Sequence, residues 1–182
     1  IQYAMTITLL IATIAINKQT IYLKNKSLGF TDDNIISIAV SYLDQSKSTV
    51  LRDILKKESG VLNASLTNRD YFDGYSSCSF DATSSSVIET YTFKVDNQFI
   101  PTLNLKLLEG RNFTENDINT TSNLIIVNEE FVKRVTFDGS PIGQIVHGCG
   151  EDYQIIGVVN NYQFLTSRDK IEPMALYTNL YK

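Results

Sequence analysis

The stretch LIIVNEEFVKRV, residues 124–135, contains the pattern that decides the fold. Leu124 to Val127 form a continuous run of branched apolar side chains, which is typical of a buried strand. Asn128 then suits the N-cap of a helix, and Glu129 and Glu130 in the first turn complement the positive end of the helix dipole. The stretch therefore predicts a strand that passes directly into a helix.

Similar signals predict strands and helices along most of the chain. Runs rich in β-branched and aromatic residues, bounded by turn residues, predict further strands. These strands are expected at residues 35–41, 61–67, 87–95, 144–148, 153–164 and 174–181. A short helix is expected from Asn97 to about Leu103, with Pro101 early enough to be tolerated.

The stretch SKSTVLRDILKKESG, residues 46–60, predicts an amphipathic helix. Ser46 or Ser48 can cap its start, Asp53 and Lys57 can pair across one turn, and Gly60 ends it. Its apolar face comprises Val50, Leu51, Ile54 and Leu55. With the flanking strands 35–41 and 61–67, it predicts a strand–helix–strand unit whose strands pair in parallel.

A polar segment from about residue 68 to residue 90 interrupts this pattern with Ser, Asp, Gly and Thr. We interpret it as an inserted β lobe or a mobile loop with an exposed tip, because strict alternation resumes directly after it.

The first sixteen residues, IQYAMTITLLIATIAI, carry no charge, and the first charged residue is Lys18. The run is slightly shorter than the roughly 20 apolar residues that span a bilayer, so we interpret it as the outer part of a transmembrane helix. The residues after it lack the small-residue cleavage site of a secretory signal peptide.

Apolar residues recur every seven positions through this helix and past its charged end, at Ile7, Ile14, Ile21 and Leu28. Such a stripe predicts a stalk that packs on a neighbouring helix, including that of a second copy. An amphipathic helix docked on its own domain explains the spacing equally well. Gly29 ends the helix in either case.

The composition argues against a nucleic-acid partner, and it does not decide whether the two cysteines form a disulfide. A net charge of −4 and a pI near 5.0, with scattered Lys and Arg, argue against nucleic-acid binding. Cys78 and Cys149 are compatible with a disulfide in an oxidising compartment and equally with two buried free thiols.

The sequence predicts no catalytic, cofactor-binding or metal-binding site. His147 and Cys149 share a strand face, but no nucleophile-bearing turn accompanies them. With Cys78 they provide three ligands, and structural zinc sites use four. The acidic groups at residues 32–33 and 115–117 lack the spacing of a calcium loop and suit solvated turns or caps. The turn at residues 148–150 lacks the Lys and Ser/Thr of a phosphate-binding loop.

The charged triplet Glu109-Gly110-Arg111 ends the apolar run NLKLL. We expect Gly110 to form a turn, with Glu109 and Arg111 as exposed or mutually paired charges. The alternative is an interface with a partner or a second copy.

Several stretches in order resemble one known family. VDNQFIPTLNLKLLEGRNF, IIVNEEFVK, PIGQIV and IIGVVNNYQF, preceded by KQTIYLKNKSLGF and DNIISI, are similar to the MacB-like periplasmic core domain of FtsX-like ABC-transporter permeases. The chain departs from the family at Asn161, where many relatives carry an acidic residue, and in its short segment 68–90.

The resemblance implies an α+β fold on an N-terminal transmembrane and stalk helix, residues 1–28, followed by the periplasmic core domain, residues 29–182. A mixed α/β lobe of strand–helix–strand units is expected at about 31–69, 96–136 and 172–182, and a smaller β-rich lobe at about 70–95 and 137–171.

The resemblance also implies a domain without enzymatic activity or cofactor in the bacterial inner membrane, facing the periplasm. It would couple ATP hydrolysis in a cytoplasmic ATP-binding subunit or domain to export of a periplasmic substrate, or to lipoprotein or peptide handling. The expected partners are that ATP-binding subunit, a second copy or a paired permease, the membrane through residues 1–16, and a periplasmic protein.

The alternative function is ligand sensing by the extracytoplasmic domain of a membrane receptor. A pilin is disfavoured because no acidic residue precedes Asp32, and an extracellular hydrolase because the catalytic arrangement is missing.

Overall fold

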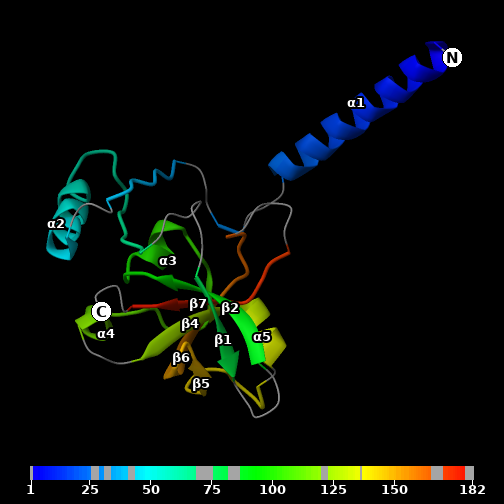
Figure 1. Cartoon of the computed structure of the whole chain (residues 1–182). Helices are drawn as coiled ribbons and strands as arrows, with labels where there is room; N and C mark the ends of the chain where they lie inside the picture. The colour runs from blue at the N-terminus through cyan, green and yellow to red at the C-terminus, as the bar shows by residue number, and fades with distance from the viewer. Residues whose placement is uncertain are drawn as a thin grey trace.

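The structure is a computed structural model, and it describes residues 2–25, 29–30, 34–40, 44–68, 76–81, 87–119, 123–135, 137–164 and 170–178. The helices are α1 (Gln2–Asn25), α2 (Gln45–Leu55), α3 (Phe99–Thr102), α4 (Glu115–Asn119) and α5 (Glu129–Val135). The strands are β1 (Ser76–Asp81), β2 (Val87–Lys94), β3 (Leu107–Gly110), β4 (Leu124–Asn128), β5 (Ile145–Gly148), β6 (Glu151–Val159) and β7 (Met174–Tyr177). The expected α+β fold with an N-terminal apolar helix is confirmed (Figure 1).

The strands form one seven-stranded mixed sheet in the order β3-β6-β4-β7-β2-β1-β5. An additional pairing between β5 and β6 closes the sheet into a ring, with β3 attached alongside β6. Strand β4 runs parallel to β6, with α5 in the connection, and antiparallel to β7. The opening stretch of sequence therefore lies at the centre of the fold.

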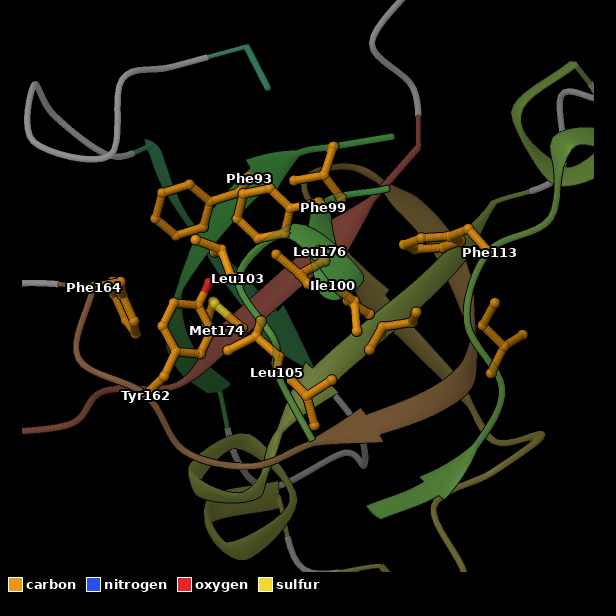
Figure 2. Packing of buried hydrophobic residues seen from close by; sticks show 14 residues of the cluster. Phe93, Phe99, Ile100, Leu103, Leu105, Phe113, Tyr162, Phe164, Met174 and Leu176 are labelled. Atoms are coloured by element: carbon orange, nitrogen blue, oxygen red, sulfur yellow. The ribbon is translucent and has the colours of Figure 1, made fainter. Parts of the chain in front are cut away.

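Alternation of side chains along the strands produces a hydrophobic cluster on each side of the sheet. In β4, Ile126 belongs to one cluster, whereas Ile125 and Val127 belong to the other. The first cluster, shown in Figure 2, joins the sheet to α3 and to the segment that follows β6. The second contains Phe131 and Val135 of α5. Both faces of the sheet are thus buried, which explains the continuous apolar runs in its central strands.

Asn128 is the predicted helix cap, and its environment confirms the prediction. Its side-chain Oδ1 accepts hydrogen bonds from the backbone N–H of Phe131 and of Met174, both at 3.0 Å. Its Nδ2 donates to the carbonyl oxygen of Glu172 at 2.9 Å. One buried amide therefore starts α5 and fixes the beginning of β7 against the end of β4.

The prediction of a strand–helix–strand unit around α2 is wrong for the residues that the structure describes. Helix α2 forms, but residues 34–40 and 61–66 belong to no strand, and only a single bridge joins Thr67 to Val95. Ile36, Ile38 and Leu62 are exposed. Strand propensity reflects packing on a paired and half-buried surface, and these segments lack that surface.

Details of α2 also differ from the sequence prediction. Asp44, rather than Ser46 or Ser48, is the N-cap and accepts a hydrogen bond from the N–H of Lys47 at 3.0 Å. Asp53 pairs with Arg52 at 2.8 Å, not with Lys57. On the expected apolar face, Val50 and Ile54 are more than half exposed.

Strand β1 was not predicted, because its sequence SSCSFD lies inside the serine-rich segment. It pairs with β2 over six residues and with β5 over two. The segment is thus partly a β element, as one of the two interpretations expected. Strands from both predicted lobes share the single sheet, and the lobe boundaries remain a prediction.

Candidate interface between the N-terminal helix and the sheet

Helix α1 is long and apolar enough to cross a membrane between Gln2 and Leu23, a stretch of 22 residues. None of its most apolar window is buried, and it extends away from the sheet in Figure 1. Ile7, Ile14 and Ile21 of the predicted stripe are each at least half exposed. Leu28, the fourth, lies outside the described residues. The alternative of a helix docked on its own domain is therefore not what this structure shows.

The threonine hydroxyl groups of α1 are satisfied within the helix. Thr6, Thr8, Thr13 and Thr20 each donate to the carbonyl oxygen four residues earlier, at 2.8 to 3.1 Å. An unsatisfied hydroxyl in hydrocarbon costs several kcal/mol, roughly as much as the burial of a large apolar side chain provides. These internal bonds make the helix surface compatible with lipid despite its threonines.

The chain enters the folded domain at Gly29 and Phe30. The Gly29 carbonyl oxygen accepts a hydrogen bond from Asn160 Nδ2 at 2.7 Å. The ring of Phe30 meets that of Tyr162 edge to face, with 6.1 Å between centroids. The N-terminal segment thus contacts the residues that directly follow β6, 131 positions later in sequence.

Gly110 is the last residue of β3, where it pairs with Gly157 of β6, and it has a structural role. Its φ is +74°, and a Cβ here would collide with the Ile156 carbonyl oxygen of β6. The next residue, Arg111, donates its N–H to that same oxygen at 2.9 Å. Glycine is therefore required both for the backbone conformation and for the close approach of β3 to β6.

The charges of the triplet do not pair with each other. Glu109 Oε2 accepts a hydrogen bond from Ser140 Oγ at 3.2 Å. Arg111 forms a two-pronged ion pair with Asp117, 2.6 Å from Nη1 to Oδ2 and 3.2 Å from Nη2 to Oδ1. Of the two expectations for these charges, mutual pairing is thus wrong, whereas Glu109 and Arg111 are exposed as the other expected. Whether the triplet also contacts a partner stays a prediction.

Asp117 is buried in α4 rather than in a solvated turn, and it takes part in capping this helix, which is the other role that the sequence suggested. Besides Arg111, its Oδ2 accepts from the N–H and the Oγ1 of Thr114, both at 2.7 Å. The Thr114 hydroxyl in turn accepts from the Asp117 N–H at 3.3 Å, which makes a capping box. The Arg111 hydrogen bond, followed by those from Thr114, lowers the pKa of Asp117 to about 2, although burial acts in the opposite direction.

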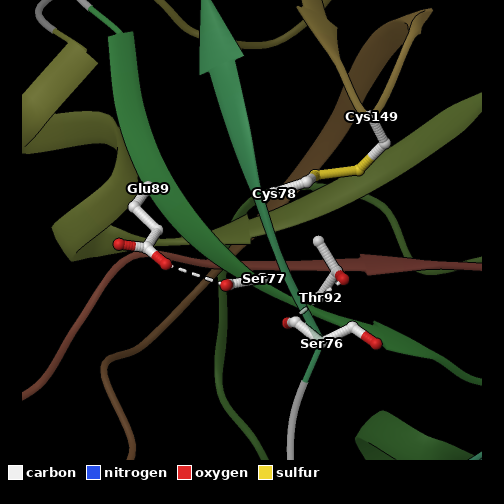
Figure 3. The surroundings of a disulfide bond; sticks show 6 residues. All are labelled: Ser76, Ser77, Cys78, Glu89, Thr92 and Cys149. Carbon is white, nitrogen blue, oxygen red and sulfur yellow. Dashed lines mark hydrogen bonds between the residues drawn. A yellow bond between two sulfur atoms is a disulfide. The ribbon is translucent and has the colours of Figure 1, made fainter.

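Cys78 and Cys149 form a disulfide, which settles the alternative that the sequence left open. The bond links β1 to the turn between β5 and β6, beside the two residue pairs that join β1 to β5 (Figure 3). His147 Nδ1 lies 2.7 Å from Asp152 Oδ1 on the surface. Because Cys149 is bonded to Cys78, it is not a free thiol that His147 could activate. No group of metal-ligating side chains occurs within the described ranges.

Two polar residues important to the architecture carried no sequence signal. Asp96 is only 1% exposed and accepts hydrogen bonds from Arg52, Leu66 and Gln98, which tie α2 to the core. Burial raises the pKa of Asp96, and these three hydrogen bonds act against that effect. For Asn160, the sequence pattern indicated only a place in a strand. Both residues act through contacts distant in sequence, which no local pattern encodes.

The chain matches the MacB-like periplasmic core domain family over residues 4–177. It is 37% identical over 76 residues to the macrolide export ATP-binding/permease protein MacB of Campylobacter fetus. It is 27% identical over 66 residues to the ABC transporter permease YvrN of Bacillus subtilis. These matches cover 41% and 36% of this chain but only 12% and 16% of the two relatives, so the chain spans a small part of their length.

Solved structures show the same fold. The extracellular domain of the transporter YknZ from Gram-positive bacteria superposes with a TM-score of 0.52 at 17% identity, covering 69% of this chain and 59% of that one. The periplasmic region of MacB from Actinobacillus actinomycetemcomitans gives 0.51 at 18% identity, covering 74% and 66%. With the match over residues 4–177, these likenesses lead to one conclusion. The chain belongs to the family of MacB-like periplasmic core domains.

Proposed function

We propose that this chain is the extracytoplasmic domain of an ABC-transporter permease, together with the end of a transmembrane helix, and that it transmits motion without catalysing a reaction. The observation that carries the proposal is the continuity between an exposed apolar helix and a segment bound to the sheet. Between Gln2 and Leu23 the surface suits lipid, and Gly29 is hydrogen-bonded to Asn160. Only residues 26–28 separate α1 from Gly29 in sequence, so a displacement of α1 would act on a packed domain, a common route for rigid-body coupling.

The disulfide supports an extracytoplasmic location. Cys78 and Cys149 lie 71 residues apart in sequence, and their disulfide joins β1 to the turn between β5 and β6. Structural disulfides persist in the periplasm and outside the cell, and they are rare in the cytosol. The domain would then face the periplasm or cell exterior, and the ATP-binding subunit or domain would act from the cytoplasmic side.

The stripe of Ile7, Ile14 and Ile21, continued by Leu28, is proposed to pack on a neighbouring helix of the permease or of a second copy. Each described member is at least half exposed, so the surface is available in the single chain. Seven-residue spacing keeps these side chains on one face of a supercoiled helix.

The alternative function, ligand sensing by a membrane receptor, would require a pocket with converging polar groups. The described residues do not support it. The described residues surround an open depression of 410 Å³, lined by Val87, Ile88, Glu89, Tyr91, Arg134 and Glu172. Arg134 is bound to Glu172 at 2.7 Å and to Glu130 at 2.8 Å. The guanidinium of Arg134 is therefore already paired with two carboxylates, whereas a ligand site requires polar groups that converge on an empty centre.

The test uses the full permease with its ATPase in lipid nanodiscs. Hydrogen–deuterium exchange is compared between the nucleotide-free and the vanadate-trapped state. We expect trapping to change exchange in the peptide containing Gly29 and Phe30. Ile21→Asp should remove this response, and Tyr22→Asp, an exposed position at the same depth but turned about 100° around the helix, should retain it. An unchanged response in Ile21→Asp would contradict the proposal, as would a soluble ligand producing the response in place of nucleotide.

A further inference from the structure

The side chain of Asn160 joins three separate segments. Its Oδ1 accepts the backbone N–H of Lys106 at 2.7 Å, and its Nδ2 donates to the carbonyl oxygen of Gly29 at 2.7 Å. Its own backbone N–H donates to the Lys106 carbonyl oxygen at 2.9 Å. The amide thus fixes the N-terminal segment to the chain that enters β3 and to the end of β6. Only a side chain with one donor and one acceptor can make both contacts.

The N-terminal segment lies directly against the backbone at this point. Gly29 has a φ of +80°, and a Cβ there would collide with the carbonyl oxygen of Asn161. Phe30 packs on Tyr162, which is only 1% exposed and belongs to the first core cluster. Displacement of this segment towards the sheet would therefore press on Asn161 and Tyr162.

The neighbouring Asn161 connects the same point to α5. Its N–H donates to Glu129 Oε1 at 2.9 Å, and its Oδ1 accepts the N–H of Glu130 at 3.0 Å. Helix α5 packs on β2, β4 and β7. Two adjacent amides thus divide the contacts: Asn160 holds the N-terminal segment, and Asn161 holds the first turn of the helix that packs against three strands.

We propose that Asn160 and Asn161 form the joint through which movement of α1 reaches the sheet, and that both are positioning residues for this coupling. The inference rests on the proposed function, because it assumes that α1 moves. It adds the route: from Gly29 to Asn160, across one peptide bond to Asn161, and into α5.

Asn160→Asp breaks this joint selectively. A carboxylate retains the acceptor for the Lys106 N–H. It loses the donor to the carbonyl oxygens of Gly29 and Asn161 and places negative charge against them. Asn112→Asp is the matched control. Asn112 also donates through Nδ2 to a carbonyl oxygen, that of Asn97 at 2.9 Å, and accepts a backbone N–H at 2.8 Å. It makes these contacts without touching Gly29 or Phe30 in the described structure.

The experiment follows exchange in the full permease on both sides of the joint, with and without vanadate trapping. In Asn160→Asp we expect the nucleotide response to persist in the peptide containing Gly29 and to fall at least threefold in the peptide spanning α5. Asn112→Asp should respond at both places as the wild type does. Nitroxides at Gln19→Cys and Lys133→Cys should report a broader distance distribution in Asn160→Asp only.

Three outcomes overturn the joint. The first is a wild-type response of α5 in Asn160→Asp, and the second is an equal loss in both variants, which would indicate general destabilisation. If Asn160→Asp does not assemble, Phe30→Ala decides, because it loosens the same segment and keeps the hydrogen bonds of the sheet. The third outcome that overturns the joint is a wild-type response of α5 in Phe30→Ala. A wild-type permease without any nucleotide response near Gly29 would instead remove the proposed function itself.

Discussion

Arg111 and Asp117 form a two-pronged ion pair, with 2.6 Å between Nη1 and Oδ2, that anchors the end of β3 to α4. Thr114 donates twice to the same carboxylate, so the pair and the helix cap are one unit. This unit and three other contacts each lead to a prediction that can be measured on the purified chain in detergent micelles.

The first prediction concerns the pH dependence of this unit. The pKa of Asp117 is about 2 in the folded chain, below the ordinary value of 3.8. Its contribution to stability is therefore complete above the ordinary value and disappears as the pH falls through about 2. We expect the stability difference between wild type and Asp117→Asn to shrink by about 1 kcal/mol on acidification, a figure reduced for solvent screening at half-exposed Arg111. Urea midpoints measured across this pH range test it.

The variants Arg111→Met and Asp117→Asn, singly and combined, provide the control for that measurement. Coupled residues give non-additive losses. Strict additivity at neutral pH would mean that the ion pair makes no contribution in solution.

The second prediction concerns Gly110. Gly110→Ala should destabilise the chain by about 3 kcal/mol or more, because left-handed strain adds to a backbone collision with Ile156. Gly143 has a comparable φ of +86°, but a Cβ added there would point into open space. Gly143→Ala should therefore lose only about 1 kcal/mol. Equal losses in thermal denaturation would show that the collision with β6 is relieved at little cost.

The third prediction compares the two carboxylates that bind Arg52. Asp96 is 1% exposed, whereas the side chain of Asp53 is 53% exposed. Asp96→Ala leaves Arg52 Nη1 and the backbone N–H groups of Leu66 and Gln98 without their acceptor and should lose about 3 kcal/mol. Asp53→Ala should lose less than about 1 kcal/mol. In limited proteolysis, α2 should become sensitive in Asp96→Ala before the sheet does, and simultaneous cleavage of both would argue against α2 as a separately anchored element.

The fourth prediction concerns the disulfide. Within the described strands only two residue pairs join β1 to β5, so the Cys78–Cys149 bond is a major constraint on the closed sheet. Cys78→Ser/Cys149→Ser should lose about 4 kcal/mol by the loop-entropy argument for a separation of 71 residues. Reductant should shift the unfolding midpoint of the wild type towards that of the double variant and leave the double variant unchanged. Free thiols detected in the wild type purified without reductant would contradict the bond.

Local patterns predicted the elements whose signals lie within a few residues. The strand at Leu124 and the cap at Asn128 are examples, because strand composition and N-cap chemistry are short-range properties. The same reasoning failed for residues 35–41 and 61–67, where high β propensity met no partner in the described residues. It also missed β1, whose polar sequence is held in place by pairing with β2 and β5.

The sequence predicted only one side of the candidate interface, the N-terminal segment. The seven-residue stripe and the glycine at position 29 are visible in the chain, but the residue that receives Gly29 is not. Likewise the sequence pattern drew attention to Arg111, but it assigned Asp117 only to a solvated turn or a cap and did not indicate that the two residues pair. Specific hydrogen bonds between distant segments depend on three-dimensional geometry, to which composition and periodicity are insensitive.

The sequence by itself determined the apolar N-terminal helix, the central strand and its helix, and the family to which the motifs belong. The helices and the strand follow from hydrophobic periodicity and capping, which act over one or two turns of chain. The family follows from the resemblance of the quoted motifs to its members. Only the tertiary structure decided that Cys78 bonds Cys149, that the sheet closes on itself, and that Asn160 receives the N-terminal segment. Those contacts arise when burial of the two apolar clusters brings distant segments together, and that packing leaves no local mark in the chain.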